Sequence, residues 1–249
     1  MSGIRRRDVL TGAALALLRG AAARAGIIKG ELPWRPDQAS PPPRVEAGPW
    51  QFFTPEEVPA IEAIVDRLIP PDPQTPGGKD AGCAVFLDRQ LAGPYGSAEG
   101  LYELGPFLHG SKQQGSQSSK TPAQAYRAAL RGLDEYCRQG RGAGTSRNKP
   151  FAGLGPEQQD DILRGLEDGS VQLSGIEAKQ FFSALLQDVQ EGFFADPVYG
   201  GNRDMCAWKM IGFPGARYDY RDWVSRHNER YPLPPVSIGG RRAWTARGR

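Results

Sequence analysis

Signals for the start of a helix recur along this sequence, and they constrain its fold more than any other feature. Thr54-Pro55-Glu56-Glu57 combines a capping threonine, a proline for the first turn and an acid that reaches back to the cap. The residues after it repeat at the 3.6-residue period of one helix face: Val58, Ile61, Ile64, Val65, Leu68 and Ile69. We expect Pro70-Pro71 to end this helix and Pro59 to distort its first turn.

Four further segments carry helical patterns. Thr121-Pro122-Ala123-Gln124 is a second capping box, and Pro156 opens another helix with acids near the positive end of its dipole. Ser174-Gly175-Ile176-Glu177 precedes an apolar stripe, and residues 84–92 are also helical in pattern. That stripe runs through Phe181, Leu185, Val189 and Phe193.

Strand patterns of useful length are missing from the sequence, and turn-forming residues are frequent. The chain has 32 Gly and 22 Pro among 249 residues, so we expect much irregular backbone between the helices. The sequence therefore predicts a mainly α fold, an irregular multi-helix domain with long Gly/Pro-rich loops. No apolar run approaches the roughly 20 residues that a membrane-spanning helix needs.

The first 25 residues have the features of a twin-arginine export signal. Arg6 and Arg7 are followed by Asp8 and two apolar residues, as the motif requires. The apolar stretch 12–18 and a small-x-small cleavage site at residues 23–25 follow. Arg5 and Arg19 depart from the usual pattern, which leaves a disordered basic arm as the alternative. We expect a periplasmic protein exported by the twin-arginine machinery.

The composition changes along the chain and divides it into four parts. Residues 1–25 are the predicted signal peptide, and residues 26–49 form a linker in which six prolines favour extended chain. Residues 50–231 hold the helical patterns and form the predicted domain. Residues 232–249 form a basic C-terminal tail with Arg241, Arg242, Arg247 and Arg249.

The three cysteines agree with export. Cys83, Cys137 and Cys206 form no Cys-x-x-Cys pair, so zinc, thioredoxin-like and haem-attachment motifs are absent from the sequence. An odd number of thiols in an oxidising compartment leaves at least one free or paired with another chain. We therefore consider an inter-subunit disulfide at one of them. The alternative is that all three are small buried hydrophobic residues.

Catalytic and cofactor motifs are not found in this sequence. Gly-x-Ser-x-Gly, His-Glu-x-x-His and the Walker phosphate loop are absent, and the glycine run 140–144 has the wrong spacing for a dinucleotide loop. His109 and His227 lie in loop-like contexts, and the two acid pairs begin helices, where the dipole explains them. A net charge of +3 gives no case for nucleic acid. We assign no catalytic, cofactor-binding or metal-binding residue to the chain.

The segment from Gly192 to Val224 concentrates large rings among turn-forming residues. Asp196-Pro197, Gly200-Gly201-Asn202 and Phe213-Pro214-Gly215 each favour a turn, so the segment is expected to be a series of turns pinned by rings. Trp, Tyr and Arg dominate binding hot spots, which makes the segment a candidate partner-docking surface with Arg221 near its rim. An aromatic-rich part of the core is a compatible alternative. The candidate docking residues are Phe193, Phe194, Tyr199, Arg203, Trp208, Phe213, Arg217, Tyr218, Tyr220 and Trp223.

Several motifs in this order resemble the gluconate 2-dehydrogenase subunit 3 family. They are Phe52-Phe53-Thr54-Pro55-Glu56-Glu57, Ile69-Pro70-Pro71-Asp72, Ala81-Gly82, Phe86-Leu87-Asp88-Arg89-Gln90-Leu91, residues 192–204 and residues 208–216. Together they span about residues 50 to 225. The tail after Tyr231 lies outside the resemblance.

The resemblance implies a role and no reaction. Members are small subunits of membrane-associated dehydrogenases that oxidise gluconate, glucose, fructose or sorbitol. A large flavin subunit of the GMC type carries FAD and the hydride chemistry, and a cytochrome c subunit with haem c passes the electrons on. The small subunit carries the export signal and is expected to stabilise the flavoprotein and to support its export. The family has no established catalytic residues, so none is carried over.

A second hypothesis is a stand-alone exported carbohydrate-active enzyme or sugar-binding protein. Its candidate residues are Asp196, Tyr199 and Asp204 within the loop 193–223, because rings beside acids suit sugar faces and hydroxyls. A deep pocket that joins these three residues would favour this hypothesis, and a flat aromatic surface would favour docking.

Overall fold

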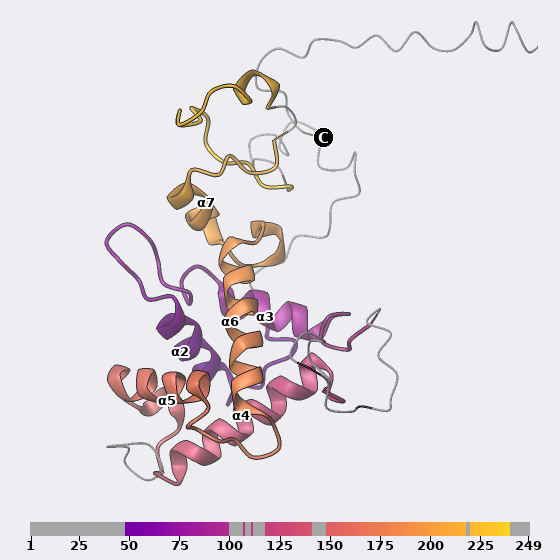
Figure 1. The fold of residues 1–249 in the computed structure, drawn as a ribbon, viewed down its shortest axis with the longest axis vertical. Helices are drawn as coiled ribbons and strands as arrows, with labels where there is room; N and C mark the ends of the chain where they lie inside the picture. Colours follow the sequence, from indigo (N-terminus) through magenta and orange to yellow (C-terminus); the bar gives the residue numbers. More distant parts are fainter. Residues whose placement is uncertain are drawn as a thin grey trace, which may run out of the picture. The chain divides into compact units, whose positions relative to one another are not determined.

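The structure is a computed structural model that describes residues 48–99, 107, 111, 118–140, 148–217 and 220–239. In these ranges the chain is helical and its β pairing is limited to two isolated bridges, which confirms the mainly α prediction (Figure 1). No helix among these residues is long and apolar enough to cross a membrane. The α-helices are α2 (Val58–Leu68), α3 (Cys83–Ala92), α4 (Pro122–Arg138), α5 (Pro156–Asp168), α6 (Ala178–Phe194) and α7 (Cys206–Ile211). The 3-10 turns are η3 (Phe151–Gly153), η4 (Pro197–Tyr199), η5 (Arg203–Met205) and η6 (Arg221–Trp223).

Helix α6 forms the centre of the core. It packs against α2, α3, α4 and α5 along its length and meets α7 beyond its C-terminal end (Figure 1). All four residues of its predicted apolar stripe are buried: Phe181, Leu185, Val189 and Phe193. Each such side chain contributes about 1.5–3 kcal/mol when it is fully removed from water. The core therefore forms around α6.

Two of the predicted helix starts are present as expected, and a third lies three residues later, because Glu177 rather than Ser174 caps α6. Thr121 caps α4 through its hydroxyl, which accepts from the backbone N–H of Gln124 at 3.3 Å, while the Gln124 side chain accepts from the Thr121 N–H at 3.1 Å. Helix α5 begins at Pro156 with the Gln158 side chain bonded to the Gly155 N–H. Helix α6 begins after Glu177. Each of these caps accepts a backbone N–H at the helix start that has no partner within the helix, and this fixes where the helix begins.

The start of α2 differs from the prediction. The Glu57 side chain accepts from the Thr54 N–H at 2.9 Å as expected, but residues 55–57 form a turn and the helix begins at Val58. Pro59 explains the delay, because it has no N–H to donate to the carbonyl of Pro55. The continuous helical bonds begin with the N–H groups of Ala60 and Ile61, both of which donate to the Glu57 carbonyl.

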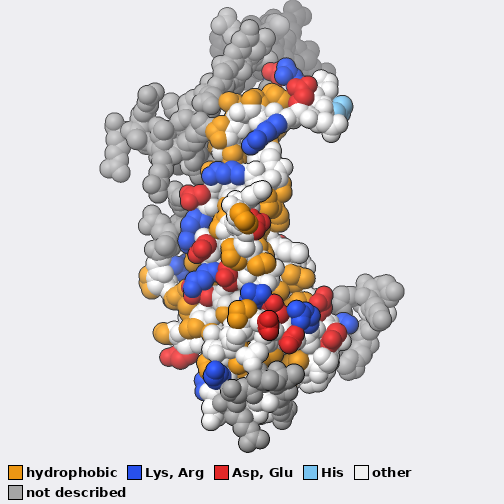
Figure 2. Space-filling view, turned by 90° about the vertical axis from the view of Figure 1, so that its left-hand side faces the viewer, with side chains coloured by type: hydrophobic (Ala, Val, Ile, Leu, Met, Phe, Trp, Pro, Cys, Tyr) orange, Lys and Arg blue, Asp and Glu red, His pale blue; other side chains and the backbone are white. Residues whose placement is uncertain are grey.

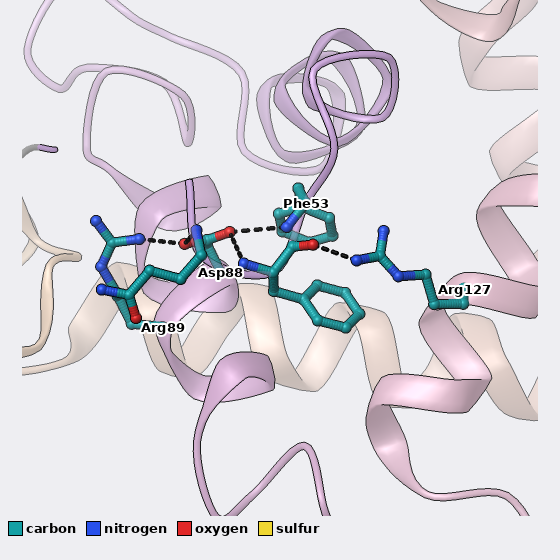
Figure 3. Close-up of polar contacts among 6 residues, drawn as sticks. Phe53, Asp88, Arg89 and Arg127 are labelled. Carbon is teal, nitrogen blue, oxygen red and sulfur yellow. Dashed lines mark hydrogen bonds and ion pairs between the residues drawn. The ribbon is translucent and has the colours of Figure 1, made fainter. Parts of the chain in front are cut away.

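A buried carboxylate fastens the segment before α2 to α3. Asp88 is fully buried and accepts the backbone N–H groups of residues 51, 52 and 53, each at 2.9 Å, and it pairs with Arg89. Figure 3 shows the carboxylate between the Arg89 guanidinium and the backbone at Phe53, with Arg127 on the other side of that backbone. Arg127 donates to the Phe52 carbonyl and pairs with Glu57. Two of the motifs that carry the family resemblance are thus bonded to each other.

A second buried carboxylate joins α4, α6 and the turn after α3. The hydroxyl of Tyr126 on α4 donates to Asp188 on α6 at 2.7 Å, and that of Tyr95, just after α3, donates at 2.9 Å. Burial raises the pKa of Asp188, and the hydrogen bonds from the two hydroxyls offset only part of that rise. Burial and the adjacent carboxylate in turn raise the pKa of Tyr126. The cluster is internal and serves the packing of α4 on α6.

Candidate partner-docking surface

Glycines hold the turns after α6 in close contact with the helices. A Cβ on Gly201 would collide with the carbonyl of Gly192 in α6, and a Cβ on Gly192 would lie 2.8 Å from the Phe86 ring of α3. Gly82, at a φ of +86°, approaches the Gly200 carbonyl so closely that its Cβ would lie 2.6 Å away. Three motifs of the family resemblance, Ala81-Gly82, residues 86–91 and residues 192–204, therefore meet at positions where a Cβ would be too close to its neighbours.

Asp196 fixes the exit from α6. Its carboxylate accepts the Val198 N–H at 2.9 Å, the Ser237 hydroxyl at 2.6 Å and the Ile238 N–H at 2.7 Å. Asp196 is buried, and Ser237 and Val236 are buried with it. The chain up to Ile238, within the predicted tail, is therefore tied to the end of α6.

Asn202 fixes the next turn. Its side-chain N–H donates to the Ala195 carbonyl at 2.9 Å, and its oxygen accepts the Ala207 N–H at 2.9 Å at the start of α7. The residue is completely buried. A single amide side chain thus closes the link between α6 and α7, with both its nitrogen and its oxygen bonded inside the protein.

Three non-glycine residues in this link have left-handed backbone. The φ angles of Asn202, Asp204 and Met205 are 44°, 56° and 56°. This region costs roughly 1–2 kcal/mol for an L-residue, so the surrounding contacts must hold it in place. Its effect is a sharp reversal that brings the short helix α7 back against the end of α6.

The reversal leaves large apolar side chains in solvent. Trp208 is buried in α7, donates its indole N–H to the Phe194 carbonyl at 2.8 Å and meets Phe213 edge-on at 5.1 Å between ring centroids. Around it four side chains are 41–57% exposed: Phe194, Met210, Ile211 and Phe213. We call these four residues the apolar patch. Hydrophobic side chains also reach the surface among Lys and Arg on the face drawn in Figure 2. These four side chains make this end of the molecule the candidate docking surface.

Residues 216–217 and 220–235 belong to a loop that is closed at its base, which we call the clasped loop. Ala216 donates its N–H to the Val236 carbonyl at 2.6 Å, and Val236 donates to the Pro214 carbonyl at 3.2 Å. Gly215 has a φ of +78°, and any Cβ there would collide with Val236. The loop carries its own small cluster, in which the Tyr231 ring contacts Tyr220, Trp223 and the guanidinium of Arg217.

A cavity of about 440 Å³ lies between α7 and the clasped loop. Its walls are the rings of Trp208, Phe213 and Tyr231 and the proline-rich run 232–235, with Lys209 and Arg230 also lining it. Lys209 and Arg230 are both exposed. The cavity combines an apolar interior with two cationic groups.

The structure places the predicted docking residues in three different environments. Phe194, Arg203 and Phe213 are exposed, Tyr199, Arg217, Tyr220 and Trp223 are partly buried, and Phe193 and Trp208 are buried. Tyr218 lies outside the described residues, and Arg221 is exposed. Phe193 and Trp208 therefore support the surface from below, because helical periodicity turns them toward the core. The prediction counted rings and arginines and so missed Met210, Ile211, Leu233 and Lys209.

The residues proposed for a sugar site are not brought together by this cavity. Asp196, Tyr199 and Asp204 are absent from its lining. Both oxygens of Asp196 accept internal hydrogen bonds, and Asp204 is exposed on the reversal. Among the described residues no group of three or more His, Cys, Asp and Glu side chains is placed to hold a metal ion. His109 lies outside the described residues, and His227 is exposed.

The three cysteines differ in how far they can be reached. Cys83 and Cys137 are fully buried, and burial raises the pKa of each thiol to about 12. Cys206, the first residue of α7, is partly exposed, and burial raises its pKa. All three are free thiols here. Cys206 is therefore the cysteine that another chain could reach without opening the core.

Comparisons with known proteins give one match. The family model described as Gluconate 2-dehydrogenase subunit 3 matches residues 55–215. No curated protein and no solved structure matches the chain. The matched range includes α2 to α7 and the apolar patch.

Proposed function

Because this chain belongs to the gluconate 2-dehydrogenase subunit 3 family, we propose that it is the small, non-catalytic subunit of an FAD-dependent sugar or sugar-acid dehydrogenase complex. The family description names a subunit of a dehydrogenase, which agrees with the resemblance found in the sequence. In this proposal a GMC-type flavoprotein subunit carries FAD and oxidises the substrate. A cytochrome c subunit with haem c accepts the electrons and provides the membrane association.

The observation that carries the proposal is the contrast between the two kinds of residue in segment 192–215. Its buried polar side chains, Asp196 and Asn202, form internal hydrogen bonds through each of their polar atoms. Its apolar side chains at the surface are not covered by the described residues. A surface whose buried polar side chains are bonded internally and whose apolar side chains are exposed suits binding to another protein better than reaction with a small molecule.

The subunit's effect on its partner follows from mass action. A protein that binds only the folded flavoprotein shifts the folding equilibrium of that flavoprotein toward the folded state. At a concentration of the small subunit about 100 times its Kd, the gain is about 2.7 kcal/mol. Stabilisation of the flavoprotein therefore requires no catalytic group on this chain.

Export is the second part of the proposed role. Arg6 and Arg7 would direct the chain to the twin-arginine machinery and thus to the periplasm. A partner bound to the small subunit before export would be carried with it. The docking surface and the export signal together give the chain a role as the escort of a subunit that lacks its own signal.

The proposal is tested by affinity purification of a C-terminally tagged full chain from the periplasm of its own host. We expect a flavin-containing chain and a cytochrome to co-purify in stoichiometric amounts, with dye reduction in the presence of gluconate or a related sugar. Replacing Ile211 and Phe213 by aspartate should abolish co-purification. Arg164→Asp on α5, where the side chain is 67% exposed, is the control and should leave it intact. A wild-type chain that emerges alone and well folded refutes the proposal.

The export part is tested separately by Arg6→Lys together with Arg7→Lys. We expect this pair of changes to retain both the small subunit and the flavoprotein in the cytoplasm, measured by blotting of cell fractions. A flavoprotein that still reaches the periplasm would refute its transport by the small subunit. Association of the two subunits in the cytoplasm would not be affected.

A further inference from the structure

The cavity between α7 and the clasped loop has the dimensions and lining of a binding recess. Its volume of about 440 Å³ lies within the roughly 300–1,000 Å³ of typical ligand pockets. Rings and prolines make up most of its wall, so an apolar group that enters it is removed from water. The apolar patch adjoins it, because Phe213 belongs to both.

Two cations at the cavity favour an occupant that carries a negative charge beside its apolar group. Lys209 and Arg230 both line the cavity and are exposed. Within the described ranges neither side chain takes part in an ion pair or a hydrogen bond to the protein. An occupant that places a carboxylate beside its apolar group would satisfy both charges, whereas a basic occupant would be repelled.

Charge also argues against one occupant from this chain itself. Residues 240–249, which continue from the clasped loop, contain four arginines and no acid. Placing them beside Lys209 and Arg230 would bring like charges together. The occupant is therefore expected from another molecule.

The prolines decide how that occupant is recognised. Three of the four residues in the run 232–235 are proline and have no backbone N–H. This wall cannot form the ladder of hydrogen bonds by which an added strand is held. Recognition must come from side chains, with an apolar anchor in the cavity and a carboxylate at the two cations.

We propose that the cavity receives a segment of the flavoprotein subunit in which an apolar anchor side chain lies next to an aspartate or glutamate. This proposal rests on the proposed function, since it names the docking element of the same partner. Lys209 and Arg230 then set the orientation and the ionic-strength dependence of the complex, and the apolar patch supplies additional contact area. The segment is defined by its chemistry and is to be identified by cross-linking.

The first test is charge reversal in the full-length chain, with Lys209→Glu combined with Arg230→Glu. We expect its Kd for the purified flavoprotein subunit to rise roughly tenfold or more at low salt, because reversed rim charges slow association. Raising the salt concentration should weaken the wild-type complex more than the variant complex. Arg138→Glu combined with Arg164→Glu, on exposed side chains of α4 and α5, is the charge-matched control and should leave the Kd unchanged. Circular dichroism confirms that each variant is folded.

The second test places a photo-crosslinking benzophenone amino acid at Leu233, which lines the cavity and is 36% exposed. Irradiation of the intact complex should join it to a flavoprotein peptide that contains an apolar residue beside an acid. Cross-links to a second copy of this chain, to another part of the same chain or to a flavoprotein peptide without an acid would overturn the proposal. So would an unchanged Kd for the charge-reversed chain. In these cases the wild-type complex still forms, so the proposed function survives. Failure of the wild-type chains to associate would refute both.

Discussion

Replacing Asp88 by alanine removes the group that fastens residues 51–53 to α3. The carboxylate is fully buried and accepts three backbone N–H groups, each at 2.9 Å, in addition to pairing with Arg89. Alanine can accept none of these bonds. The segment that precedes α2 would then lose its polar attachment while its Phe53 ring remains in the core.

The cost follows from the surroundings of each donor. The Phe53 N–H is buried, and leaving it unsatisfied costs about 1–3 kcal/mol. The N–H groups of Gln51 and Phe52 are partly buried, so water replaces the carboxylate there at a net loss of about 0.5–1.5 kcal/mol each. The total is about 2–6 kcal/mol before the loss at Arg89, against a stability of about 5–15 kcal/mol for a typical domain.

Urea denaturation followed by circular dichroism measures this loss, and hydrogen exchange at residues 51–53 localises it. Asp88→Asn should fall between wild type and alanine, because one oxygen can still accept from Phe52 and Phe53 while the bonds from Gln51 and Arg89 are lost. The control is Asp161→Ala, which breaks an exposed ion pair with Arg164 and should cost about 0–1 kcal/mol. Equal losses for Asp88→Ala and Asp161→Ala would refute the anchoring role.

Three further changes probe other parts of the structure. Tyr126→Phe removes a 2.7 Å hydrogen bond to a buried carboxylate and should lower the free energy of unfolding by about 1.5–3 kcal/mol in urea titrations. Iodoacetamide should modify Cys206 before Cys83 in the native chain, because Cys83 is fully buried and its pKa is raised to about 12; peptide mass spectrometry gives the order. Gly201→Ala should prevent a stable fold, since its Cβ would collide with backbone in α6, and the yield of soluble protein and its melting temperature test this.

Gly201→Ala and Tyr126→Phe each have a control variant in the same chain. Gly175→Ala meets no atom within 4 Å and should show only the cost of its φ of +78°, about 1–2 kcal/mol. Tyr95→Phe removes a longer bond to the same carboxylate from a more exposed ring and should cost less than Tyr126→Phe. If Gly201→Ala costs no more than Gly175→Ala, the close contact at α6 is not required. Equal modification rates at Cys83 and Cys206 would contradict the burial of Cys83.

The sequence predicts the helices well because their signals are local. The capping box at Thr121 and the apolar stripe of α6 depend on residues three or four positions apart, and both are found as expected. The start of α2 is harder because two prolines compete within five residues, and Pro59 rather than Pro55 decides where the helical bonds begin.

The candidate surface could be located from sequence but not resolved into buried and exposed residues. Ring content singled out this segment as the candidate surface, yet Trp208 is buried and Met210 is exposed because left-handed backbone at Asp204 and Met205 sets the direction of α7. No short-range pattern encodes that reversal. The bonds from Asp196 to Ser237 and Ile238 span more than forty residues and likewise leave no local signal.

That long-range attachment has a consequence for the order of events during protein synthesis. Asp196 is translated 41 residues before Ser237. The carboxylate at the end of α6 therefore lacks its hydrogen bond from Ser237 until the ribosome has completed the clasped loop. Helices α2 to α6 all precede the clasped loop in the sequence and are synthesised before it. The cavity acquires its second wall only after residue 238 has been added. A chain truncated before residue 238 would therefore keep its helices but lack one wall of the cavity.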